Sequence, residues 1–178
     1  MTTIGVAIAV PEPWGAQLKS FREALGDPTT EGVPTHITLV PPVEVDVDAI
    51  AAVEQHLAEA AADHTSFRVH LRGTGTFRPV SPVVFVVVAE GISACEMLAF
   101  SVRRGPLALE LQFPYHPHVT VAHQLSEDQL DQAFEELSGF ECQFEADHFS
   151  LYVHGDHNGW RRSRDFALSR RARSSGSG

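Results

Sequence analysis

The order of predicted strands and helices repeats once along the chain, and this repeat limits the possible folds more than any other feature. Each half of the 178 residues predicts a strand, a helix, a strand, a helix and a strand. Matching elements lie at a nearly constant offset: the second strands hold His36 and His118, and 118 − 36 = 82. We interpret the halves as two similar lobes, of residues 1–80 and 81–169, that can exchange strands. The alternative is a chance rhythm in an alternating chain.

The elements of the first half follow from the spacing of its apolar residues. In chain order they are a strand at Ile4–Val10, a helix marked by Trp14, Leu18, Phe21 and Leu25, a strand at Thr35–Val40, a helix marked by Ile50, Val53 and Leu57, and a strand at Phe67–Arg72. We expect Pro41 and Pro42 to end the second strand, because proline has no backbone N–H to donate.

The second half repeats this order and then adds a strand. Its elements are a strand at Val83–Ala89, a helix marked by Ile92, Cys95, Ala99 and Val102, a strand at His118–Ala122, a helix that opens with a capping box at Ser126–Gln129, a strand at Asp147–His154 and a hairpin partner at Trp160–Leu168. Residues 170–178 are polar and end in serine and glycine, which predicts a disordered tail.

Both second strands contain a histidine followed two positions later by a threonine. The two segments are His36-Ile37-Thr38-Leu39 and His118-Val119-Thr120-Val121. Residues two apart in a strand point to the same face, so each histidine shares a face with its threonine. If a pseudo-twofold axis relates the lobes, both faces line one cleft. A single copy is usually a half-buried histidine beside a β-branched residue, but two copies in matching strands favour a functional site.

Two imidazoles and two hydroxyls that converge on one group suit the cleavage of a phosphodiester. Histidine titrates near neutral pH, so one ring can accept a proton from the attacking water while the other protonates the leaving oxygen. The hydroxyls can donate hydrogen bonds to phosphate oxygens as their charge builds. We therefore predict His36 and His118 as catalytic residues and Thr38 and Thr120 as phosphate-binding residues. This arrangement needs no metal or other cofactor.

The composition of the chain indicates which kinds of molecule it can bind. A net charge of −10 argues against tight binding to long duplex nucleic acid, because many phosphates would have to be neutralised. No apolar run approaches the roughly 20 residues that cross a bilayer. Cys95 and Cys142 have no metal-type partner nearby, and a reducing compartment requires no disulfide. We therefore expect a cytoplasmic protein that binds a small ligand and does not bind membranes.

With these motifs the sequence resembles the two-histidine (2H) phosphoesterases, and more narrowly the bacterial 2′-5′ RNA ligase-like proteins, also called RNA 2′,3′-cyclic phosphodiesterases. The resemblance rests on His36-Ile37-Thr38-Leu39 and on the longer segment from Tyr115 to Ala122, which reads Tyr-His-Pro-His-Val-Thr-Val-Ala. The Gly-rich stretch from Gly73 to Pro79 also looks like the one that precedes the family's central strand. The likeness runs from about Ile4 to Leu168.

The resemblance implies a single bilobal α+β domain over residues 1–169, with an antiparallel sheet and two helices in each lobe and the active cleft between them. It also implies an enzyme that opens 2′,3′-cyclic phosphates of nucleotides or RNA ends and leaves a 2′-phosphate. His36 would be the general acid and His118 the general base, although the pseudo-symmetry makes the two positions chemically alike. We expect a monomer.

Four further residues are candidates for contact with the substrate. Arg78 follows the Gly-rich stretch and either reaches the phosphate or lies solvated at a strand end. Tyr115 and His116 precede the second motif and either stack on a base or sugar, or belong to a strand entrance shaped by neighbouring prolines. Tyr152 contacts the ligand if its strand face meets the cleft, and is otherwise exposed.

The histidines also suggest a metal site, which we consider the weaker hypothesis. A zinc site needs three or four converging ligands. His116 and His118 can share a strand face, but His123 would point to the opposite face if the strand continued regularly. These histidines, with His154 and His157, also lack a nearby Cys or Glu at a familiar metal spacing. We therefore expect no bound metal.

Two other functions remain open from the sequence. The same cleft could hold a nucleotide or a phosphorylated RNA end without turning it over, which would make the protein a binding module. It could also cleave or join 2′-5′ linkages, as some relatives of the resembled family do.

Overall fold

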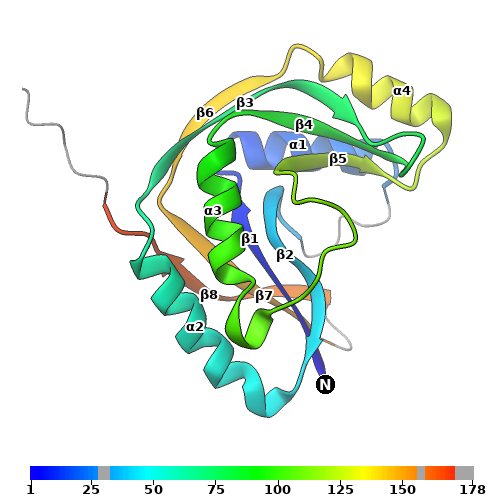
Figure 1. The fold of residues 1–178 in the computed structure, drawn as a ribbon. Coiled ribbons are helices and arrows are strands. Elements are labelled where there is room, and N and C mark those ends of the chain that lie inside the picture. The colour runs from blue at the N-terminus through cyan, green and yellow to red at the C-terminus, as the bar shows by residue number, and fades with distance from the viewer. Residues whose placement is uncertain (28–32, 156–158, 171–178) are drawn as a thin grey trace, which may run out of the picture.

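The computed structural model describes residues 1–27, 33–155 and 159–170 (Figure 1). Within them, eight strands form one sheet in the order β6-β3-β4-β5-β2-β1-β7-β8, and every neighbouring pair is antiparallel. The strands are β1 (Thr2–Ala9), β2 (His36–Val45), β3 (Phe67–Thr76), β4 (Val83–Glu90), β5 (His118–His123), β6 (Glu141–Ala146), β7 (His148–Gly155) and β8 (Gly159–Ala167). The α+β class with antiparallel pairing is confirmed.

The sheet has two halves, joined at its centre. One half is β2-β1-β7-β8 and the other is β5-β4-β3-β6. The inner strands β2 and β5 pair only at Ile37 and Val119. Strand β3 belongs to the first sequence repeat but pairs with β4, in the half that contains β5. Strand β7 belongs to the second repeat but pairs with β1, in the half that contains β2. The repeats therefore exchange one strand, and neither could form its half of the sheet alone.

Helices cover each half of the sheet. They are α1 (Trp14–Ala24), α2 (Ile50–Ala62), α3 (Ile92–Val102) and α4 (Glu127–Glu136), with short 3-10 turns at Val47–Ala49 and Gly105–Leu107. Helices α1 and α4 contact the half that contains β5, whereas α2 and α3 contact each other and the half that contains β2 (Figure 1).

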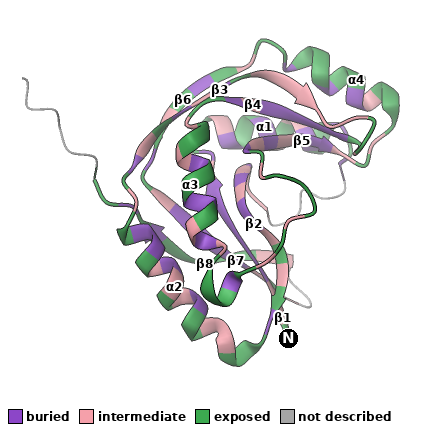
Figure 2. Ribbon diagram, in the orientation of Figure 1, coloured by how far each residue is buried: buried purple, intermediate pink, exposed green. Residues whose placement is uncertain are grey.

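One leucine from each helix is fully buried in the core. These are Leu18, Leu57, Leu98 and Leu130, each with 0 % of its surface exposed. Figure 2 shows the same pattern as buried stripes on the helices and along the central strands. The apolar spacing that predicted the helices thus marks the face that each one packs inward.

The predicted capping box opens α4. The Ser126 side chain accepts a hydrogen bond from the Gln129 backbone N–H, and the Gln129 side chain accepts one from the Ser126 backbone N–H. Helix α1 is followed by Gly26 at φ +78°, a conformation that glycine adopts without strain.

Two expectations about strands were wrong. Strand β2 does not end at Pro41 and Pro42 but continues to Val45. Both prolines fall where the register between β1 and β2 shifts, between the pairs Ile4–Val43 and Val6–Val40, so no ladder hydrogen bond needs their missing N–H groups. Strand β6 was not predicted at all, although its burial alternates along an edge that pairs with β3.

Among the helices of the described residues, none combines the length and the apolar composition needed to cross a bilayer. Residues 171–178, which make up nearly all of the predicted tail, lie outside the described residues.

Candidate functional site

The two His-x-Thr segments meet at the centre of the sheet. Ile37 pairs with Val119, and both side chains have 0 % exposure on the core face. An antiparallel register through this pair sets His36 opposite Thr120 and Thr38 opposite His118. These four side chains are all half-buried and share the other face of the sheet. The sequence repeat therefore brings together the two motifs that it duplicates.

The two imidazoles are held in the same way. His36 Nδ1 lies 2.7 Å from the carbonyl oxygen of Pro34, and His118 Nδ1 lies 2.7 Å from that of His116. A carbonyl oxygen only accepts, so Nδ1 is the donor in both rings. Each Nε2 is then the atom that can accept or release a proton.

Burial lowers the pKa of both histidines, because desolvation disfavours the charged ring. The hydrogen bond to the Pro34 carbonyl opposes this shift at His36, and the positive charge of Arg22 adds to it. At His118 the carbonyl bond opposes the shift, while His116 and His36 add to it. The effect of His36 on His118 means that a positive charge on one ring disfavours a positive charge on the other.

A cavity of about 360 Å³ opens beside the paired motifs. It is lined by Gly5, Val6, Ala7, Arg22, Val33, His36, Thr38, Val40, Pro42, Thr120, His123, Tyr152 and Trp160. Four of the predicted site residues therefore line it: His36, Thr38, Thr120 and Tyr152. His118, Arg78, Tyr115 and His116 do not.

His118 lies beside the cavity in a cluster of aromatic rings. Its centroid is 4.9 Å from that of Phe77 and 5.3 Å from that of Phe85, and both rings meet it edge-on. His116 contacts the same two phenylalanines but is itself exposed. The cluster fixes the plane of the His118 ring in addition to its Nδ1 hydrogen bond.

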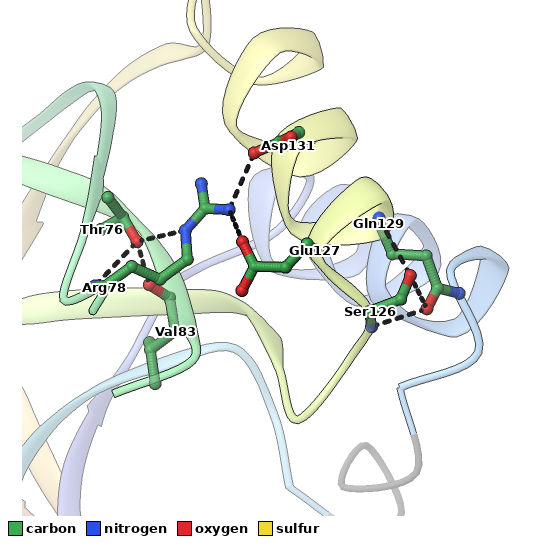
Figure 3. Close-up of polar contacts among 7 residues, drawn as sticks. All are labelled: Thr76, Arg78, Val83, Ser126, Glu127, Gln129 and Asp131. Carbon is green, nitrogen blue, oxygen red and sulfur yellow. Dashed lines mark hydrogen bonds and ion pairs between the residues drawn. The ribbon is translucent and has the colours of Figure 1, made fainter. Parts of the chain in front are cut away.

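Arg78 does not line the cavity. It is bound instead by two carboxylates of helix α4 (Figure 3). Its Nη1 donates to Asp131 Oδ1 at 2.8 Å and to Glu127 Oε2 at 3.1 Å, and its Nε donates to Thr76 Oγ1 at 3.1 Å. The guanidinium charge is thus balanced by two carboxylates, so the contacts in the structure serve the junction of β3 with α4 rather than a phosphate.

Tyr115 contacts the motif through the backbone. Its hydroxyl donates to the carbonyl oxygen of Thr38 at 2.7 Å. Burial raises the pKa of this phenol, so it stays protonated and keeps donating. Tyr115 therefore ties the segment before β5 to β2 and helps to set the spacing of the two motifs.

Sequence reasoning missed Arg22, which lines the cavity from α1. Its Nε and Nη2 donate to Asp27 Oδ2 at 3.0 and 2.8 Å, and its Nη1 donates to the Thr120 carbonyl at 3.3 Å. One signal was available: Arg22 follows Leu18 by four positions and precedes Leu25 by three, so a charged residue stands on the apolar stripe of the helix.

Sequence reasoning also misplaced His123. The register between β4 and β5 shifts by one residue, since Val84 pairs with Ala122 but Phe85 pairs with Thr120. Val121 is the extra residue, and a bulge of this kind reverses the alternation of side chains beyond it. His123 therefore lines the cavity together with Thr120 instead of pointing to the opposite face.

Among residues 1–27, 33–155 and 159–170, no group of three or more His, Cys, Asp or Glu side chains is arranged to hold a metal ion. His157, one of the histidines weighed for such a site, lies outside these ranges.

Comparisons with known proteins identify the family of the chain. The family model described as the 2′-5′ RNA ligase superfamily matches residues 10–158. A protein of Oceanobacillus iheyensis named "Putative phosphoesterase" is 26 % identical over 168 residues, which cover 93 % of this chain and 98 % of that protein. A Bacillus licheniformis protein with the same description is 29 % identical over 151 residues, covering 84 % and 88 %.

Solved structures share the fold. Escherichia coli LigT in complex with 3′-AMP superimposes with a TM-score of 0.68 at 20 % identity, covering 94 % of this chain and 98 % of LigT. The protein TT0787 of Thermus thermophilus gives 0.64 at 21 % identity, covering 97 % and 100 %.

Proposed function

Because the chain belongs to the 2′-5′ RNA ligase superfamily, we propose that it is a metal-independent phosphoesterase that hydrolyses 2′,3′-cyclic phosphates of nucleotides or RNA ends. One observation supports this proposal above the others. The β2–β5 pair at Ile37 and Val119 sets two histidines and two threonines on one face of the sheet. Two imidazoles that can take opposite protonation states, one neutral and one protonated, are what acid–base cleavage of a phosphodiester requires.

In the proposed reaction the phosphate lies between the two motifs. Nε2 of His118 takes a proton from the attacking water, whose oxygen forms the new bond to phosphorus. The bond from phosphorus to the ribose 3′ oxygen breaks, and Nε2 of His36 gives that oxygen its proton. A 2′-phosphate results. The hydroxyls of Thr38 and Thr120 donate to the non-bridging oxygens.

The assignment of His36 as the acid and His118 as the base follows the resemblance to the 2H phosphoesterases, because the two rings have the same hydrogen-bond pattern. A bound phosphate anion adds negative charge beside both rings. It therefore favours the protonated form that one of them must supply.

The size of the cavity and the net charge of the chain favour a small substrate. A cavity of about 360 Å³ lies at the lower end of the volumes usual for small-molecule sites. The net charge of −10 disfavours long nucleic acids. The structural neighbour LigT has been crystallised with 3′-AMP and with phosphate, so the same fold accommodates a mononucleotide. A cytoplasmic location and a monomeric state stay predictions.

Replacing either histidine tests the proposal. His36→Ala and His118→Ala should each lower kcat for adenosine 2′,3′-cyclic phosphate by at least about a hundredfold, the usual scale for loss of general acid–base catalysis. Thr38→Val and Thr120→Val should lose less, because each removes one hydrogen bond. His148→Ala is the matched control, since that ring is partly exposed and bound to Asp147 outside the cavity. Wild-type turnover in both catalytic variants would refute the assignment.

A panel of substrates separates this function from its alternatives. Cyclic mononucleotides, 2′-5′ dinucleotides and 3′-5′ dinucleotides are incubated with the protein and followed by phosphorus NMR. Preferential opening of the cyclic phosphate supports the proposal. Faster cleavage of the 2′-5′ dinucleotide would assign that activity instead. Tight binding by calorimetry with every phosphate intact would indicate a binding module.

A further inference from the structure

The two motifs differ at the position two residues before each histidine. In both, Nδ1 of the histidine donates to the backbone carbonyl of that residue. The residue is Pro34 before His36 and His116 before His118. The two catalytic candidates therefore receive the same hydrogen bond, but one of them follows an uncharged proline ring and the other follows a second imidazole.

The ring of His116 lies beside that of His118. Their centroids are 5.9 Å apart and their planes are inclined by 39°. Both rings meet Phe77 and Phe85 at a steep angle, and those of His116 do so at centroid distances of 5.5 and 5.4 Å. A Cβ at Gly75 would lie 2.7 Å from two carbons of Phe85, so the phenyl ring rests directly on this backbone. This apolar wall removes part of the water that would screen a charge on one imidazole from the other.

The elements packed around His118 present few charged groups. Strand β4 contributes Phe85 and Val87, and Phe77 precedes β4. Strand β2 contributes Thr38 and His36, and the segment before β5 contributes His116.

Burial lowers the pKa of His118 most, and the charge of His116 lowers it further, ahead of that of His36. Because the side chain of His116 is exposed, it can take up a proton from solvent in mildly acidic conditions. A proton on His116 therefore opposes a proton on His118.

The charge near the other histidine is compensated. Burial lowers the pKa of His36 most, and the nearby cation is Arg22. The guanidinium of Arg22 is itself paired with the Asp27 carboxylate at 2.8 Å. Within the part of the chain that the structure describes, no carboxylate is ion-paired with His116. The uncompensated charge thus lies on the His118 side of the pair.

We propose that His116 is a positioning residue that breaks the pseudo-symmetry of the two motifs: its ring beside His118 makes His118 the base and leaves His36 as the acid. This rests on the proposed function, because it concerns the roles of the two histidines in that reaction. A base must be neutral when the water attacks, and a positive charge on His116 keeps the neighbouring ring in that form. His116 does not line the cavity and acts through His118.

Two variants separate the charge of His116 from its ring. His116→Phe keeps an aromatic ring against Phe77 and Phe85 but has no charge, whereas His116→Arg is charged at every pH but has no ring. Both keep the backbone carbonyl that binds His118.

The pH profile for adenosine 2′,3′-cyclic phosphate measures the effect of each variant. His116→Phe should lower kcat/KM at least about threefold at about pH 5, where His118 now gains a proton more readily. At about pH 8, where imidazole is normally neutral, it should stay within about twofold of the wild type. His116→Arg should stay within about twofold of the wild type at the lower pH, because it keeps the charge.

A role in packing alone gives the opposite pattern. His116→Phe would then resemble the wild type at every pH and His116→Arg would lose activity at every pH, which would overturn the proposal. An equal loss in both variants at every pH would overturn it as well. His148→Phe is the matched control, because that ring is bound to Asp147 outside the cavity, and it should leave the profile in place. Thermal unfolding of each variant checks that the fold is kept.

Titration of the imidazoles by NMR keeps the test independent of turnover. His116→Phe should raise the midpoint of His118 and move that of His36 less, and His116→Arg should not raise it. If the wild type hydrolyses no cyclic phosphate but the midpoint moves in this way, the proposed reaction fails and the effect of His116 on His118 stands. If the midpoint of His118 does not move, or moves while the pH profile does not, the proposed role of His116 is wrong.

Discussion

At the scale of single residues, the environment of His36 and His118 sets the acidity of each ring. Both Nδ1 atoms donate to a carbonyl two residues earlier, and both rings lose solvent on burial. Arg22 adds a positive charge near His36, while its own charge is paired with Asp27. The short motif His-x-Thr-x therefore supplies the imidazoles and hydroxyls of the site. Residues distant in sequence, such as Arg22, adjust the pKa of the imidazoles.

These shifts predict the pH dependence of the reaction. The pKa of each ring lies below its ordinary value of 6.5. The acid must be protonated, so kcat/KM falls as pH rises through its pKa; the base must be neutral, so kcat/KM falls as pH drops through its pKa. Both limits are displaced downward, and the maximum of kcat/KM should lie on the acid side of pH 6.5. A maximum at or above neutral pH would contradict this.

Arg22→Met provides the matched variant for that profile. Removing the positive charge raises the pKa of His36, so the limb of the profile that His36 controls should move to higher pH, while the limb controlled by His118 stays nearly in place. Titration of the two imidazoles by NMR assigns each limb. The change also removes two hydrogen bonds to buried Asp27, so we expect a loss of roughly 3 kcal/mol in stability.

At the scale of elements, the site depends on how β2 and β5 are held together. They share only the pair Ile37–Val119, so other contacts must fix their spacing. Tyr115 donates across this junction to the Thr38 carbonyl, and Arg22 donates to the Thr120 carbonyl. Both contacts reach the backbone of a motif threonine, one from each side of the junction.

Tyr115→Phe should weaken this junction without touching the cavity. The lost hydrogen bond costs about 1 kcal/mol of stability. Because the Thr38 hydroxyl is then less well placed, kcat should fall severalfold with little change in KM. Urea unfolding and steady-state kinetics measure the two effects. Unchanged kcat together with the expected loss in stability would restrict Tyr115 to a structural role.

The local spacing of apolar residues predicted most helices and strands but not the bulges within the strands. The apolar spacing that included Leu18, Leu57 and Ala99 marked three of the helices and their buried sides, and the capping box marked the start of the fourth. The bulge at Val121 was not predictable, because it depends on pairing with β4, and it alone turns His123 into the cavity. Strand β6 was missed although Cys142, Phe144 and Ala146 alternate with polar residues as a half-buried strand does.

At the scale of the whole molecule, the repeat explains why the two motifs meet. Exchange of β3 and β7 between the halves makes one sheet, and its centre is the place where the motif strands lie side by side. The repeated order of elements and the face of each motif were predictable from the sequence alone. The cavity was not, because Gly5, Tyr152 and Trp160 belong to three strands whose order is set by the sheet as a whole.

The central claim is that His36 and His118 act on the same phosphate. A crystal structure of the protein with adenosine 2′-monophosphate, the product of the proposed reaction, tests it most directly. The account predicts Nε2 of both histidines within about 3.2 Å of oxygens on a single phosphate, with the hydroxyls of Thr38 and Thr120 on the remaining oxygens. A phosphate bound by only one of the two histidines, or bound elsewhere, would contradict it.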